Sequence, residues 1–329
     1  MVTEKDYRWR RRLEGAIRVK RLEMAIWMVA GATLMAGSAF AQSEKATGQG
    51  RAVVTIFAKH SELAPNISQQ DVSVKVNGNP SSVTGWLPLK GANDGLELVV
   101  LIDGGARNLG RQFDEIAHFV QGLGPHTKVA VGYMENGRAA LAGPLSADHA
   151  QVLLGLHLPV GPSSSPYFSL SDLAQNWPSK ERGVRREVVL LTDGIDPNNQ
   201  RFDPDDPYVQ SAIKDSVRAG LVVYTIYWRS RYGGDINSMT ADGGQSLLAE
   251  VTEATGGNNY WMGTGNPVSF QPFFEDLARR LENQYQLDFT ARLDRKPTVE
   301  SMKLKVEGLA LEVAAPQLVF VDRAGAGAE

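Results

Sequence analysis

The sequence contains no cysteine in its 329 residues. This absence excludes disulfides, thiolate metal sites and a lipid anchor on a cysteine. Histidine is scarce, with five residues and no pair at the HExxH spacing of a zinc site. The GxSxG, GxxxxGK[ST] and GxGxxG patterns are also missing, which removes the usual sequence signs of a serine hydrolase or a nucleotide-binding loop. Stability must come from an apolar core, for which the chain is long enough.

Neither positive nor negative charge is in large excess. The formal net charge is −3, but residues 1–41 hold eight basic and four acidic side chains. The remaining residues hold 26 basic and 33 acidic side chains, a net charge of −7. A mildly acidic chain without a basic, aromatic stripe is not expected to bind nucleic acid. The acidic balance favours solubility.

The N-terminal segment has the features of an export signal. Residues 1–23 are polar and basic, and an apolar stretch runs from Met24 to about Ala36. Ser38-Ala39-Phe40-Ala41 then fits signal peptidase cleavage before Gln42, so we expect residues 1–41 to be a signal peptide. This predicts a secreted or periplasmic protein with no stable membrane anchor after cleavage. An uncleaved N-terminal anchor is the alternative, and translation could begin at Met1 or at Met24.

The rest of the chain divides by composition and periodicity into five segments. We expect a linker over 42–50, an N-terminal β flank over 51–90 and a C-terminal β flank over 285–323. Between the flanks, strand and helix patterns alternate over 91–284, and residues 324–329 form a tail too small and polar to pack. This alternation predicts an α/β domain with a doubly wound, mostly parallel, Rossmann-like sheet. We expect the two β flanks to join in one small β-sandwich, because neither has enough apolar surface to fold alone.

Two strand ends within the α/β segment carry most of the information about function. Residues 96–107 read LELVVLIDGGAR, and residues 187–196 read EVVLLTDGID. Each apolar run suits a strand buried on both faces and stops at an Asp-Gly pair, Asp103–Gly104 and Asp193–Gly194. Ligands of parallel α/β sheets bind at the carboxyl ends of the strands. The two carboxylates therefore suggest a shared site for a divalent cation or a basic partner.

These elements resemble a von Willebrand factor A (VWA) domain. The resemblance rests on the strand-Asp-Gly-Gly element at 98–105 and the strand-Thr-Asp-Gly element at 188–194. Gln70-Asp71-Val72 leading into VNGNP, and FFEDLARRLENQYQLDF at 273–289, are similar to the acidobacterial-type VWFA-related domain of secreted bacterial proteins. The resemblance covers roughly residues 52–320, judged by pattern.

The resemblance implies a metal-ion-dependent adhesion site, but a degenerate one. The family uses an Asp-x-Ser-x-Ser loop, a Thr from a second loop and an Asp from a third to hold Mg²⁺. Here Asp103 keeps the first carboxylate, whereas Gly105 and Arg107 replace both serines. Ser165 matches the Thr position and Asp193 the third loop. The first interpretation is a dead metal site, in which Arg107 pairs with Asp103 or Asp193.

The second interpretation is a weakened Mg²⁺ or Ca²⁺ site that uses Asp103, Ser165, Asp193 and Asp196, completed by water. We expect no cofactor, with Mg²⁺ or Ca²⁺ as the only alternative. The predicted function is that of a non-enzymatic binding module for a protein partner, and the expected contact loops are 103–108, 161–168, 194–207 and 229–243. Metal-dependent adhesion is the alternative function. A metal-assisted hydrolase is less well supported, because the sequence shows no nucleophile and base.

Overall fold

The computed structural model describes residues 46–59, 66–229, 238–263, 265–293, 296–308 and 310–323. The expected signal peptide over 1–41 and the tail over 324–329 lie outside these residues. None of the helices in this part of the chain is long and apolar enough to cross a membrane.

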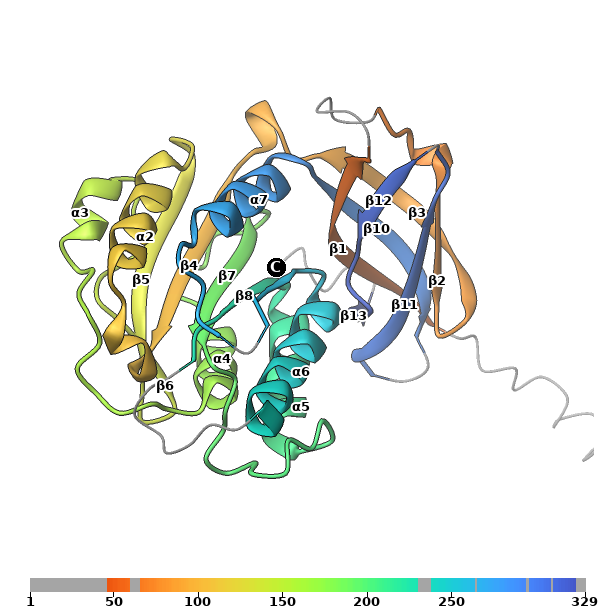
Figure 1. The fold of residues 1–329 in the computed structure, drawn as a ribbon. Helices are drawn as coiled ribbons and strands as arrows, with labels where there is room; N and C mark the ends of the chain where they lie inside the picture. The colour runs from red at the N-terminus through yellow and green to blue at the C-terminus, as the bar shows by residue number, and fades with distance from the viewer. Residues whose placement is uncertain are drawn as a thin grey trace, which may run out of the picture. The chain divides into compact units, whose positions relative to one another are not determined.

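The larger of the two sheets is antiparallel and is built from both ends of the chain (Figure 1). Its strands are β1 (Ala46–Ala58), β2 (Val72–Val76), β3 (Asn79–Pro88), β10 (Gln284–Leu293), β11 (Thr298–Val306), β12 (Leu311–Ala314) and β13 (Leu318–Arg323). The order is β10-β3-β2-β11-β13-β1-β12, and β10 also pairs with β1. That last pairing closes six strands into a barrel and leaves β12 attached to the far half of β1.

The barrel closes along a long register between the first and the tenth strand. Ten residue pairs join β1 to β10, from Ala46 opposite Leu293 to Thr55 opposite Gln284. Phe289 is fully buried and its ring lies over Gly50, where a Cβ atom would come within 2.3 Å of the ring. A glycine is required there, because any side chain would displace the central aromatic ring of the barrel.

The second sheet has six strands and is mixed. Its strands are β4 (Leu96–Asp103), β5 (Thr127–Glu135), β6 (Arg138–Leu141), β7 (Arg185–Thr192), β8 (Leu221–Tyr227) and β9 (Asn259–Tyr260). The order is β6-β5-β4-β7-β8-β9. The pairs from β5 to β9 are parallel, whereas β6 is antiparallel to β5 through the hairpin at Asn136-Gly137.

Helices cover this mixed sheet, and short 3-10 turns join several of the elements. The helices are α2 (Arg111–Gly122), α3 (His149–Leu153), α4 (Pro166–Gln175), α5 (Pro207–Ala219), α6 (Ser238–Thr255) and α7 (Gln271–Glu282). The 3-10 turns are η1 (Gln69–Asp71), η2 (Gly91–Asn93) and η3 (Gly104–Asn108). Leu98, Val100 and Ile102 of β4 pack with α2 and α7, whereas Val99 and Leu101 pack with α4, α5 and α6. Alternation along a strand covered on both faces explains why every residue of β4 is buried.

The predicted fold class is therefore wrong in its architecture. A doubly wound, mostly parallel sheet with a small β-sandwich was expected, but the structure has a closed six-stranded antiparallel barrel beside a mixed sheet. The two terminal segments do pair with each other, but they form a closed barrel and not a sandwich. Alternating apolar residues indicate which face of a strand is buried, and this pattern is the same in a sandwich and in a barrel. Strand β1 also begins at Ala46, inside the predicted linker over 42–50.

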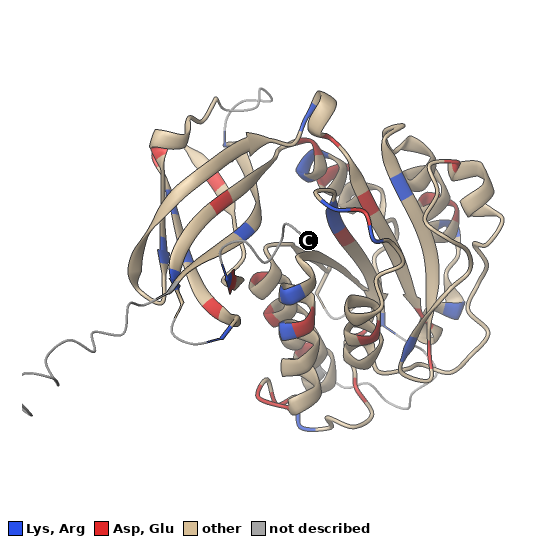
Figure 2. Cartoon of the chain, turned by 180° about the vertical axis from the view of Figure 1, so that it is seen from behind, with Lys and Arg blue, Asp and Glu red and all other residues tan. Residues whose placement is uncertain are grey.

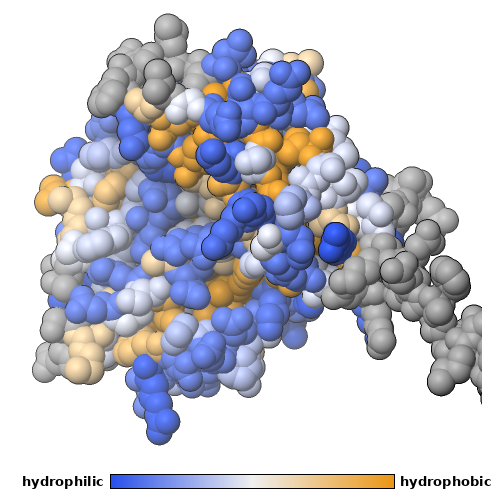
Figure 3. Space-filling view, turned by 90° about the vertical axis from the view of Figure 1, so that its right-hand side faces the viewer, coloured by the Kyte–Doolittle hydropathy of each residue, from blue (hydrophilic) through white to orange (hydrophobic). Residues whose placement is uncertain are grey.

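The barrel and the mixed sheet are joined by the chain itself and by hydrogen bonds. Helix α7 ends at Glu282 and β10 begins two residues later. Asn283, between them, accepts a hydrogen bond from the Ile56 amide at 2.9 Å. On the other side, the Gln317 amide donates to the Glu253 carbonyl at 3.0 Å. Basic and acidic residues are interspersed over both sheets (Figure 2), and on the barrel side hydrophobic side chains gather in the middle of the face (Figure 3).

Candidate functional site

The two Asp-Gly strand ends meet at one edge of the mixed sheet. Strands β4 and β7 are parallel neighbours, with Ile102 opposite Leu191. The residues that follow, Asp103 and Thr192, therefore leave the sheet side by side. Asp103 and Asp193 are both buried. The parallel register thus brings together the carboxylates of two loops that are about 90 residues apart in the sequence.

The carboxylate of Asp103 is held by donors from three segments. Its Oδ1 accepts from the Gly105 amide at 3.0 Å and from the Ser164 amide at 3.3 Å. Its Oδ2 accepts from the Thr192 hydroxyl at 2.9 Å. Burial raises the pKa of Asp103, and these hydrogen bonds oppose the shift. Asp103 thereby ties together η3, the loop before α4 and the end of β7.

A second buried carboxylate, Asp196, lies against the start of α4. The Ser165 hydroxyl donates to Asp196 Oδ2, and the same oxygen of Ser165 caps the helix by accepting from the Phe168 amide at 3.3 Å. Asp196 Oδ1 accepts from the Asn198 amide at 2.8 Å. Ser165 and Asp196, both named from the sequence, are thus in direct contact.

Asp193 points into a tight turn at the end of β7. Its Oδ1 accepts from the Ile195 amide at 3.0 Å. Gly194 has a φ of +71° and lies so close to Gly244 of α6 that a Cβ atom would be 2.5 Å from the Gly244 carbonyl. Only glycine meets both conditions. Asp193 also contributes to raising the pKa of Tyr227 to about 12, after the larger effect of burial.

Gly105 and Arg107 lie in η3, directly after Asp103. Gly105 contributes its backbone amide to Asp103 and has no side chain to offer a cation. Arg107 donates to the Gly161 carbonyl at 2.9 Å and to the Gly104 carbonyl at 3.4 Å. These contacts place the guanidinium across the loop before α4. The ion pair of Arg107 with Asp103 or Asp193 stays a prediction.

Three residues of this network were not singled out in the sequence. Thr192 and the Ser164 amide both donate to Asp103. Tyr167 is fully buried and donates its hydroxyl to the Gly194 carbonyl at 2.9 Å. Burial raises the pKa of Tyr167 well above its usual value, and the charges of Asp196 and Asp193 add to the effect. The hydroxyl of Thr192, directly before Asp193 at the end of an apolar run, was the one available signal.

A further loop, residues 261–269, joins this edge of the sheet and was also missed. The Trp228 indole donates to Asn108 Oδ1 at 2.9 Å, and the Arg229 amide donates to Asn266 Oδ1 at 2.5 Å. Gln112 of α2 donates to the Val268 carbonyl at 2.8 Å. These bonds link η3 and the end of β8 to the loop before α7.

Apolar side chains on these loops are turned to solvent. Val160 is 85% exposed and Val268 is 77% exposed. Trp261 is 52% and Met262 is 61% exposed, directly after β9. A separate hollow of about 530 Å³ lies between the 136–138 hairpin, α4 and Asn198, and none of these four side chains lines it. Exposed Trp and Met side chains are typical of surfaces that contact proteins.

Other acidic and histidine side chains of the α/β segment have structural roles. Asp203 Oδ1 accepts from the Asp205 amide, and Asp206 caps α5. His149 contacts the Thr127 carbonyl and His157 the Leu158 carbonyl, away from Asp103. Within the described part of the chain, no group of three or more Asp, Glu or His side chains is arranged to hold a metal ion.

The comparisons with known proteins give distant likenesses. No family model and no curated protein matches the chain. An aerotolerance-related membrane protein of Bacteroides fragilis is 15% identical, with 57% of this chain and 98% of the other covered and a TM-score of 0.41. The vWF domain of the pilus tip protein Mfa5 from Porphyromonas gingivalis is 11% identical (56% and 94% covered, TM-score 0.38), and the SpRpn10 VWA domain is 13% identical (55% and 92% covered, TM-score 0.36). Two of these proteins are named as vWF or VWA domains, the family that the sequence resembles. At this distance the likeness carries no functional argument, so function is argued from the residues.

Proposed function

We propose that this chain is an exported, non-enzymatic protein-interaction module with a degenerate metal-ion-dependent adhesion site. The observation that carries the proposal is the contrast at the carboxyl edge of the mixed sheet. The buried Asp103 carboxylate accepts hydrogen bonds from three protein donors, while Trp261, Met262, Val160 and Val268, on loops after β9, before α4 and before α7, are exposed. A buried polar network combined with exposed apolar side chains on nearby loops favours contact with a protein over catalysis.

The arrangement around Asp103 favours a site without metal. Gly105 lacks an oxygen ligand, and the two protein amides and one hydroxyl on Asp103 occupy positions that a cation would need. Arg107 places a positive charge on the Gly104 carbonyl, next to Asp103. Even at an effective dielectric constant of about 20, a unit charge about 4 Å from a divalent ion costs several kcal/mol.

The same residues do not support catalysis. Ser165 donates to a carboxylate, but no histidine contacts it among the described residues, and its oxygen caps α4. A hydroxyl nucleophile requires a base within hydrogen-bond reach, which here would have to be the buried Asp196. The direct contact of Ser165 with Asp196 instead favours the second candidate function, metal-dependent adhesion, because two oxygen ligands already meet there.

We propose export of the protein on the basis of its N-terminal sequence. The basic segment, the short apolar stretch and the Ala39-Phe40-Ala41 pattern support export to the periplasm or the medium. A protein partner in that compartment is the proposed ligand.

Capture of partners from the exported fraction, with Mg²⁺ or with a chelator, tests the proposal. We expect the same partner in both conditions, and loss of capture with Trp261→Ser plus Met262→Ser, which removes exposed contact area. Leu87→Ser, an exposed apolar residue of the barrel, is the control and should retain the partner. Capture that requires Mg²⁺ contradicts the metal-free site, and capture that survives the Trp261/Met262 variant contradicts this surface.

Calorimetry with Mg²⁺, Ca²⁺ and Mn²⁺ separates the two candidate functions. The unmodified protein should give no saturable heat. Gly105→Ser with Arg107→Ser should restore some affinity, because it returns two hydroxyl ligands and removes the positive charge. Micromolar binding by the unmodified protein that is lost in Asp193→Ala would instead establish metal-dependent adhesion.

A further inference from the structure

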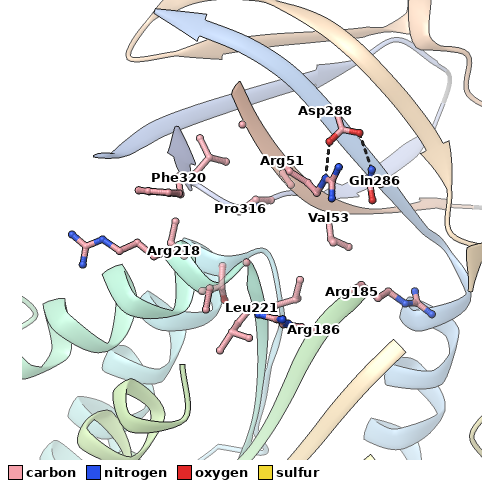
Figure 4. Close-up of a pocket in the computed structure, with 18 of the residues that line it drawn as sticks. Arg51, Val53, Arg185, Arg186, Arg218, Leu221, Gln286, Asp288, Pro316 and Phe320 are labelled. Atoms are coloured by element: carbon pink, nitrogen blue, oxygen red, sulfur yellow. Dashed lines mark hydrogen bonds and ion pairs between the residues drawn. The ribbon is translucent and has the colours of Figure 1, made fainter. Parts of the chain in front are cut away.

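A cleft of about 810 Å³ lies at the opposite edge of the mixed sheet from Asp103 (Figure 4). One wall comes from β1, β10 and β13 of the barrel. The other comes from the turn before β7, the amino ends of β7 and β8, and the end of α5. Beside the cleft, the Gln317 amide, directly before β13, donates to the Glu253 carbonyl of α6 and joins the barrel to the helical layer. The cleft is therefore formed without a bound ligand, and its volume is that of a small-molecule site.

The middle of the cleft is apolar. Val53 of β1 and Phe320 of β13 are half-buried and line it from the barrel (Figure 4). An apolar body placed against them would exchange water for carbon contacts, which favours binding.

The polar lining is dominated by arginine. Six arginines and three carboxylates line the cleft, although the whole chain has a net charge of −3. One of the carboxylates, Asp288, already accepts from Arg51 Nε and from Gln286, each at 2.7 Å. A cleft with an excess of one charge concentrates ligands of the opposite charge.

Two of these arginines have donors to offer a ligand. Arg51 bonds Asp288 through Nε, its side chain is 57% exposed, and its terminal amino groups form no hydrogen bond with the described residues. Arg182, in the turn before β7, is exposed and forms no hydrogen bond or ion pair with the described residues. Guanidinium groups bind carboxylate and related anions through paired N–H donors.

We propose that this cleft binds a small amphipathic organic anion. Its apolar body lies against Val53 and Phe320, and its anionic head bonds the guanidinium groups of Arg51 and Arg182. The site is separate from the loops around Asp103, so its occupancy does not depend on the protein-interaction function.

Calorimetry with decanoate tests the proposal, with decyltrimethylammonium as the probe of equal chain length and opposite charge. We expect saturable binding of one decanoate and at least tenfold weaker binding of the cation. Arg182→Gln removes one charged donor and should weaken decanoate binding about three- to tenfold. Gln49→Trp fills the cleft from an exposed position of β1 and should abolish binding.

Arg111→Gln is the matched control, because it removes the same charge from an exposed arginine at the start of α2, outside the cleft. It should leave decanoate affinity unchanged. Circular dichroism establishes that each variant is folded. Equal binding of decanoate and the cation, an equal loss in Arg111→Gln and Arg182→Gln, or full binding by folded Gln49→Trp would each overturn the proposal.

Discussion

The two edges of the mixed sheet hold buried carboxylates in different ways. At the carboxyl edge, Asp103 ends β4 and accepts three hydrogen bonds from backbone amides and a hydroxyl. At the amino edge, Glu187 of β7 is fully buried, and neither of its carboxyl oxygens has a hydrogen-bond partner within the described part of the chain. Asp103 lies at the end of its strand and Glu187 near the start of its strand, so different elements cover the two carboxylates.

Loops cover the carboxyl edge, whereas α7 and the start of β10 cover the amino edge. Loop backbones have unpaired amides that can turn toward a carboxylate. Around Glu187, by contrast, Arg185 directs its Nη1 to the Leu281 carbonyl at 2.7 Å and to Gln284, and Gln284 donates to the Tyr224 hydroxyl at 3.1 Å. The polar side chains where β7, α7 and β10 meet mainly form hydrogen bonds with one another and not with Glu187. Burial raises the pKa of Glu187, and the positive charge of Arg185 opposes the shift.

The largest effect in this comparison is expected for Asp103→Asn. The amide nitrogen cannot accept a hydrogen bond, so at least one of the three donors loses its partner in a buried position. We expect a loss of about 2–4 kcal/mol of unfolding free energy, measured by urea denaturation. Asp205→Asn, in an exposed loop, is the control and should change stability little. A loss no greater than that of the control would show that the loops do not depend on this carboxylate.

Thr192→Val should have a smaller effect, because it removes one donor and keeps the shape of the side chain. The Thr192 hydroxyl also accepts from the Gly194 amide at 3.2 Å, so two weak bonds are lost. We expect a loss of about 1–2 kcal/mol. In a double-mutant cycle with Asp103→Asn the two losses should not add, because the residues share a bond. Full additivity would argue against a coupled network.

Glu187→Gln should have the smallest effect, and one that depends on pH. A carboxyl group with a raised pKa in the folded state binds its proton more tightly there than in the unfolded chain. Its contribution to stability is complete below the unfolded pKa and is lost as pH rises through the folded pKa. The glutamine variant does not titrate, so its stability relative to the unmodified protein should increase with pH across that window. Denaturation of both proteins from pH 4 to pH 8 measures this, and a constant difference would show that Glu187 keeps its ordinary pKa.

The sequence located the carboxyl edge well and the amino edge poorly. Asp103 and Asp193 were identified because each ends an apolar run at an Asp-Gly pair, and Ser165 and Asp196 proved to be in contact. Thr192 belongs to the strand-Thr-Asp-Gly motif, but the sequence does not show that its hydroxyl bonds Asp103. Glu187 was missed because an acidic residue at the start of an apolar run looks like a strand boundary at the surface. Whether Arg107 pairs with Asp103 or Asp193 stays a prediction.

The sequence by itself determined which residues form strands and helices around the two Asp-Gly motifs, because periodicity and turn chemistry are local. It also determined that both ends of the chain are β-rich. Only the tertiary structure decided that β1 pairs with β10 over ten positions and closes a barrel, since pairing between segments more than 200 residues apart leaves no local pattern. The same pairing places the barrel wall opposite β7 and β8 and forms the arginine-lined cleft, which is a property of two surfaces and of neither segment alone.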